Sequence, residues 1–121
     1  TGFTLATTFQ LAHVMPETVF PELNEKFTME ENWVVHQLQT TSDFAQNSKL
    51  ISWYIGGLNF QVEHHLFPNI CHIHYKKIAK IVEETAKDYN IVYNNIPTMF
   101  GALASHAKLL KDLGKKEIAI A

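Results

Sequence analysis

The stretch from Gly56 to Tyr75 carries four of the seven histidines of this chain, beside aromatic residues and prolines. The glycine pair Gly56 and Gly57 either breaks a helix or lets a neighbouring backbone or ligand approach closely. Pro68 keeps Phe67 out of helical geometry. Any helix that holds the first two of these histidines therefore lies between the glycine pair and the proline.

Within this stretch, Gln61, His64 and His65 form the pattern Q-x-x-H-H. In a helix, residues three and four apart share a face, so Gln61 lies between two imidazoles that diverge by about 100°. Two histidines aimed apart in this way can serve two neighbouring metal ions, or one ion and a group that supports its ligand. Neutral imidazole is the commonest protein ligand for zinc and iron, so the pattern indicates a metal site.

The composition excludes several other kinds of site. All ten basic residues are lysine, so the chain lacks the guanidinium fork that reads phosphates and base edges, and nucleic acid is not an expected partner. The single cysteine, Cys71, excludes an internal disulfide and a CxxC metal site. A metal would therefore be held by nitrogen and oxygen. No run reaches the roughly 18 to 20 apolar residues that span a bilayer.

The apolar spacing predicts an all-α fold of about four to five helices, with at most a short extended piece at 90–94. Residues 1–15 are expected to be the end of an uncharged apolar helix that is buried or spans a membrane. Residues 16–95 are expected to form the histidine-rich region. Residues 96–121 are expected to form an amphipathic helix and a frayed tail, with Gly114 as the helix C-cap.

Two further helices follow from local signals. Thr28 is expected to cap a helix, with Glu31 completing a capping box. On that helix Asn32 and His36 are four residues apart and face the same way. A solvated asparagine and a surface histidine are the simpler interpretation of that pair taken alone. Residues 75–89 place apolar side chains at helical spacing opposite charged ones, which predicts an amphipathic helix.

The remaining histidines are weaker candidates. His13 stands where the apolar segment ends, either hydrogen-bonded at a helix end or bound to a metal or substrate. His72 and His74 follow the Q-x-x-H-H pattern closely and are further candidate ligands. His106 lies within the last expected helix and is interpreted as a partly exposed helix residue.

Three runs of this chain resemble the membrane-bound fatty acid desaturases, and especially their front-end acyl-lipid or acyl-CoA branch. The runs are G-G-L-N-F-Q-V-E-H-H-L-F-P at 56–68, H-Q-L-Q-T-T-S-D-F-A at 36–45 and H-I-H-Y at 72–75. The first run is highly specific to that family. The resemblance covers roughly residues 9 to 95.

The resemblance implies a non-haem di-iron centre held by three histidine boxes on the cytosolic side. The last box would be Gln61, His64 and His65, with both histidines as iron ligands and Gln61 standing where other branches have a ligand histidine. The resemblance also implies that His36 ligates iron and that Asn32 acts through a water molecule. Imidazole suits such a centre because it resists oxidation where thiolate would not.

The same resemblance implies an integral membrane enzyme with this portion on the cytoplasmic side. Its substrate would be a fatty acyl chain, its co-substrate dioxygen, and its electrons would come from a cytochrome b5 or ferredoxin-type donor. The first two histidine boxes and most membrane spans are not in this chain. We therefore expect the C-terminal portion of the enzyme, inactive alone and weak in metal binding. Apolar residues such as Trp53, Tyr54 and Ile55 would then promote self-association.

Two other interpretations stay open. The first is a small helical metal-binding or structural domain, which tight stoichiometric zinc binding and a raised melting temperature would favour. The second is a related di-iron hydroxylase or sphingolipid desaturase, which shares the histidine pattern. Gln61 points to the front-end branch, and product analysis would decide.

Overall fold

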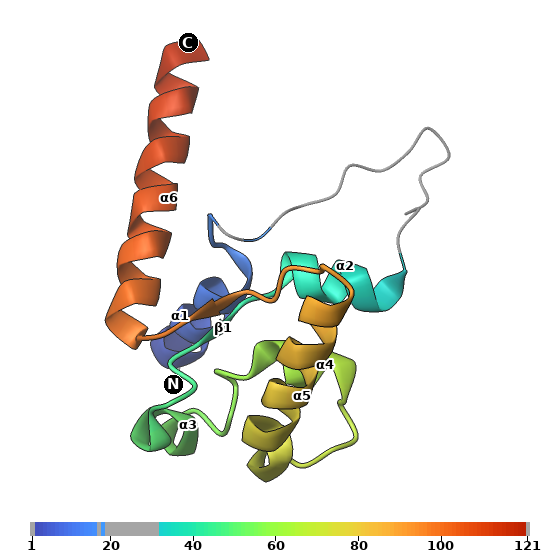
Figure 1. Ribbon diagram of the computed structural model, residues 1–121. Coiled ribbons are helices and arrows are strands. Elements are labelled where there is room, and N and C mark those ends of the chain that lie inside the picture. Colours follow the sequence, from blue (N-terminus) through green and yellow to red (C-terminus); the bar gives the residue numbers. More distant parts are fainter. Residues whose placement is uncertain (1, 17, 19–31, 121) are drawn as a thin grey trace.

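The computed structural model describes residues 2–16, 18 and 32–120 of the chain (Figure 1). The mostly helical class predicted from the sequence is confirmed, with six α-helices in these residues where four or five were expected. The elements in chain order are α1 (Gly2–His13), α2 (Trp33–Thr40), β1 (Asp43–Phe44), α3 (Lys49–Tyr54), α4 (Gln61–Leu66), the 3-10 helix η1 (His72–His74), α5 (Tyr75–Asp88), β2 (Asn95–Ile96) and α6 (Met99–Ile120).

The helices form two groups that a short sheet connects (Figure 1). In one group α1 packs against α6, and in the other α4 packs against both α2 and α5. The strands β1 and β2 are parallel, with Asp43 opposite Asn95 and Phe44 opposite Ile96. This pairing joins the segment that follows α2 to the segment that precedes α6, and so it connects the two helical groups.

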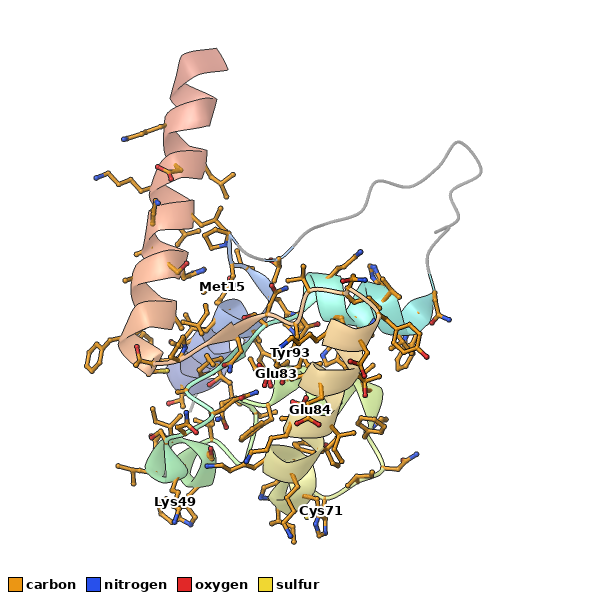
Figure 2. All side chains as sticks on the ribbon, in the orientation of Figure 1. Met15, Lys49, Cys71, Glu83, Glu84 and Tyr93 are labelled. Carbon is orange, nitrogen blue, oxygen red and sulfur yellow. The ribbon has the colours of Figure 1, made fainter. Side chains whose placement is uncertain are left out.

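The buried apolar residues form three clusters that match this division. The first lies between α1, β1 and α6, where Met15 is seen beside α6 (Figure 2); it consists of Leu11, Ala12, Met15, Phe44, Ala45 and Ala102. The second joins α2, α4 and α5 through Leu38, Val62 and Ala86. The third joins the start of α4 to α5 through Phe60, Tyr75 and Ala79. α5 therefore buries one face, as the amphipathic pattern predicted.

The glycine pair and Pro68 determine where α4 can begin and end. Gly56 and Gly57 have φ angles of 63° and 79°, so they form a left-handed turn that separates α3 from α4. Phe67, which precedes Pro68, has φ −132° and ψ 58° and is not helical. The break at Phe67 was predicted, and the break at the glycine pair was one of the two expected alternatives. Together they leave a helix of six residues for the Q-x-x-H-H pattern.

Replacement of Gly57 by alanine is expected to destabilise the fold by about 1–3 kcal/mol. An added Cβ would lie 2.7 Å from Cβ of His72, and the φ of 79° is strained for any residue with a side chain. Denaturant unfolding measures this effect. The matched control is Gly114→Ala, where the new methyl group meets open space within α6 and should stabilise the helix by up to about 1 kcal/mol. Equal effects at the two glycines would contradict this account.

The start of α2 differs from the expectation. Asn32 does not lie on the helix face with His36 but is the N-cap of α2, and its Oδ1 accepts a hydrogen bond from Val34 N at 2.9 Å. An asparagine side chain satisfies a helix N-terminus well, which explains this position. The expected capping box of Thr28 and Glu31 lies outside the described residues.

Two other boundaries also differ. α6 continues through Gly114 to Ile120, so the expected C-cap and frayed tail are wrong. Glycine in a helix interior costs about 1 kcal/mol, which the neighbouring helix-forming residues tolerate. The extended piece expected at 90–94 becomes a strand only at 95–96, where the backbone of β1 provides hydrogen-bond partners.

Apolar side chains remain exposed on α1 and α3. Phe3, Trp53 and Tyr54 are exposed, as expected for the last two, whereas Ile55 packs against the cluster that contains Leu11. Among the helices of the described residues, none combines the length and the apolar character that crossing a membrane requires.

Candidate functional site

Three histidine side chains from two helices meet beside α2. His64 and His65 belong to α4, and His13 is the last residue of α1. The ring centroids of His13 and His65 are 5.2 Å apart, and those of His64 and His65 are 6.0 Å apart. We call His13, His64 and His65 the histidine group. The fold therefore adds a distant histidine to the pair that the sequence pattern identified.

Gln61 completes the histidine group from within α4. Its side chain is buried, and its Nε2 lies 3.3 Å from Nε2 of His65, one turn further along the helix. Because an amide nitrogen only donates, this contact is a hydrogen bond to the lone pair of the imidazole Nε2. Oε1 of Gln61 is buried and has no hydrogen-bond partner among the described residues.

Helix α2 supplies a hydrogen-bond acceptor to His65. Nδ1 of His65 donates to Oε1 of Gln37 at 2.6 Å. Burial lowers the pKa of His13. Burial and the neighbouring histidines lower the pKa of His65 as well. Both rings are therefore neutral at pH 7, which is the form that binds metals.

The other residues expected in the site make no ring contact or hydrogen bond with the histidine group among the described residues. His36 is half-buried on α2, its Nδ1 has no partner in the described part of the chain, and no ring contact there joins it to the group. Asn32 caps the same helix at its exposed start. His72 and His74 are exposed on η1. The metal-binding roles expected for these four residues stay predictions.

A buried carboxyl cluster supports α4 away from the histidines. Asp43 and Glu63 are fully buried. Oδ1 of Asp43 accepts a hydrogen bond from Val62 N at 2.8 Å, which provides the side-chain cap that the residue before α4 does not supply. Oδ2 of Asp43 accepts from the Tyr93 hydroxyl at 2.8 Å and from Nε2 of Gln46 at 2.7 Å.

Tyr93 lies near the middle of the molecule (Figure 2), and its hydroxyl is also 3.0 Å from Oε1 of Glu63. Burial, followed by the charge of Asp43, raises the pKa of Glu63 to about 9. Burial also raises the pKa of Asp43. Asp43 accepts more hydrogen bonds than Glu63, so within the pair a shared proton lies preferentially on Glu63.

The donor atoms suit iron or another borderline metal, because they are imidazole nitrogens and an amide oxygen. Oε1 of Gln61 and Nδ1 of His36 are buried and have no hydrogen-bond partner in the described residues, which is compatible with contact to a metal. Within residues 2–16, 18 and 32–120, no three histidine, cysteine, aspartate or glutamate side chains are arranged to hold a metal ion.

The sequence analysis missed Gln37, Asp43, Glu63 and Tyr93. Their contacts join residues 19 to 50 positions apart, and no local spacing indicates such pairs. Only for Glu63 does the local sequence spacing indicate a separate role. Glu63 stands two residues after Gln61 in the same short helix, so the two side chains point in nearly opposite directions. Only one of them can face the histidine group.

Comparisons with known proteins show which family most of this chain matches. Residues 1–97 match the family model described as fatty acid desaturase. The chain is 43% identical over 112 residues to the sn-1 linoleoyl-lipid 6-desaturase of Arthrospira platensis, which covers 93% of this chain and 30% of that protein. It is 42% identical over 120 residues to an acyl-lipid (8-3)-desaturase of Physcomitrium patens, which covers 99% of this chain and 25% of that protein. The chain thus spans 25% to 30% of the length of these two relatives. No solved structure matches it.

Proposed function

This chain belongs to the fatty acid desaturase family, and we propose on that premise that it is part of an enzyme that introduces a double bond into a fatty acyl chain. The names of the relatives refer to linoleoyl-lipid and acyl-lipid substrates, which favours an acyl chain carried on a lipid over one carried on coenzyme A. The observation that carries the proposal is the contact between the rings of His13 and His65, with the ring of His64 beside that of His65, inside the matched residues.

In this proposal His64 and His65 hold iron through their ring nitrogens, and His13 joins them because its ring lies against that of His65. Gln61 has to turn its amide away before Nε2 of His65 binds a metal, since the amide occupies that lone pair. His36 stays a further candidate ligand, supported by its buried Nδ1 without a partner in the described residues.

When bound, a non-haem di-iron centre supplies, with dioxygen and two electrons from a cytochrome b5 or ferredoxin-type donor, the oxidising chemistry that removes two hydrogen atoms from a CH₂–CH₂ pair. The residues of this chain contribute neutral, oriented imidazoles. Burial keeps His13 and His65 unprotonated at neutral pH. Asp43 fixes the first turn of α4, which carries the histidine pair.

The remaining ligands, in this proposal, come from the rest of the whole protein, because the described residues supply only part of a coordination sphere. The whole protein would be integral to a membrane, with the histidine group on the cytoplasmic side. The 121-residue chain alone would then be inactive, and its exposed Trp53 and Tyr54 would promote self-association.

His65→Ala in the whole protein is expected to remove the new unsaturated fatty acid from the lipids of an expressing cell, because a ligand is lost. Gas chromatography of the fatty acids measures the product, and it also separates a double bond from the hydroxyl group that a related hydroxylase would introduce. The control is His106→Gln, since Nδ1 of His106 donates to the carbonyl of Val14 at 2.7 Å and lies outside the histidine group.

Normal product from the His65→Ala protein would overturn the proposal. Product formed by the 121-residue chain alone would contradict the partial-site interpretation. Tight stoichiometric zinc binding by that chain, with a raised melting temperature, would favour a structural metal domain instead.

A further inference from the structure

The hydrogen bond between His65 and Gln37 is the shortest polar contact of the histidine group. Nδ1 of His65 lies 2.6 Å from Oε1 of Gln37, which comes from the adjacent helix α2. Gln37 and His65 are 28 residues apart, so the contact depends on the packing of α2 against α4. Neither motif spacing nor the proposed function assigns a purpose to Gln37.

The two contacts of the His65 ring are compatible in a single tautomer. An amide oxygen only accepts, so Nδ1 carries the hydrogen that is donated to Gln37. Nε2 is then the lone-pair nitrogen, which agrees with the amide nitrogen of Gln61 that lies 3.3 Å away and donates to it. The neutral ring of His65 is thus fixed from both sides, with Nε2 as the basic atom.

We propose that Gln37 is a positioning residue that holds His65 in the Nδ1–H tautomer and orients its ring, so that Nε2 is the nitrogen presented to a metal. The assignment of Nε2 as a metal ligand rests on the proposed function, whereas the tautomer does not. Ligand histidines commonly donate their second ring N–H to an oxygen acceptor, and loss of that acceptor lowers metal affinity by about 10–100-fold.

The alternative is that Gln37 only fills space between α2 and α4. Leucine at position 37 would still fill that space but could accept no hydrogen bond from Nδ1. The amide of Gln61 could then rotate and present its partnerless Oε1 to an Nε2–H group. Gln37→Leu therefore favours the opposite tautomer if the hydrogen bond sets it, and leaves the tautomer unchanged if Gln37 only packs.

The test uses the 121-residue chain with ¹⁵N-labelled imidazoles at pH 8, where His65 is neutral. We expect Nδ1–H for His65 in the unmodified chain and a shift toward Nε2–H in Gln37→Leu. Gln37→Glu should restore Nδ1–H, because its carboxylate also accepts. Gln39→Leu is the matched control, since Gln39 is also half-buried on α2 and makes no hydrogen bond with its side chain in the described residues. Amide spectra check that every variant is folded.

Zinc titration of the same samples provides the second readout, because zinc is diamagnetic and takes imidazole ligands. We expect zinc to shift Nε2 of His65 and to bind about tenfold or more weakly to Gln37→Leu than to Gln39→Leu. An unchanged tautomer in Gln37→Leu, or equal zinc affinities for these two variants, would overturn the inference. No zinc response in any sample, with the tautomer pattern as expected, would overturn the role of Nε2 as a zinc ligand in this chain and would still support Gln37 as the residue that sets the tautomer.

Discussion

Asp43→Ala is expected to lower the free energy of unfolding by about 3 kcal/mol or more. The substitution leaves the buried amide of Val62 without an acceptor, and it removes a buried charged partner from the Tyr93 hydroxyl and from Nε2 of Gln46, which keep Glu63 and Tyr93 as their other partners. Each buried donor left without a partner costs about 1–3 kcal/mol. A domain of this size is stable by only about 5–15 kcal/mol, so the variant should be close to unfolding. Urea unfolding followed by circular dichroism measures the loss.

Two variants separate this effect from a loss of charge or volume. Asp43→Asn keeps an oxygen for Val62 but directs an amide nitrogen at the donors of Tyr93 and Gln46, so we expect an intermediate loss of stability. Asp112→Ala, on the exposed surface of α6, should change stability by at most about 0.5 kcal/mol. An Asp43→Ala protein as stable as Asp112→Ala would show that the cluster does not hold α4.

The parts of the fold that local chemistry determines could be predicted from the sequence. The breaks at Gly57 and Phe67 follow from glycine and proline geometry, and α5 follows from apolar spacing over a long segment. The strand pair could not be predicted. Each strand has two residues, and the pairing of Asp43 with Asn95 depends on how the two helical groups pack rather than on any local pattern.

In the candidate site too, local spacing predicts some of the arrangement and long-range packing determines the rest. The positions of Gln61 and His65 on one face of a short helix followed from their spacing of four residues. The neighbour of His65 from another helix did not, because it depends on where α1 ends relative to α4. The family resemblance implied His36 and Asn32 as the supporting pair, yet Asn32 caps α2 and the ring that contacts His65 is that of His13. Long-range packing thus decides which histidines become neighbours.

Raising the pH from about 5 to about 9 is expected to destabilise the folded chain through Glu63. The pKa of Glu63 is raised to about 9 in the folded state, by burial first and the charge of Asp43 second, whereas an unfolded glutamate has a pKa of about 4.3. Between these values the folded state binds a proton that the unfolded state has lost. The free energy of unfolding therefore falls as pH rises, with a limiting slope of about 1.4 kcal/mol per pH unit.

Glu63→Gln isolates the contribution of Glu63 to the pH dependence of the free energy of unfolding. Glutamine is neutral at every pH and keeps an oxygen next to the Tyr93 hydroxyl. The lowered pKa values of His13 and His65 act in the opposite sense, since they reduce stability as pH falls below about 6.5, but they are common to both proteins and cancel in the difference. We expect the variant and the unmodified chain to be similar in stability near pH 5, and the variant to be more stable by several kcal/mol near pH 9. A stability difference that does not change with pH would show that Glu63 is ionised in the folded chain, and the buried pair would then carry two charges.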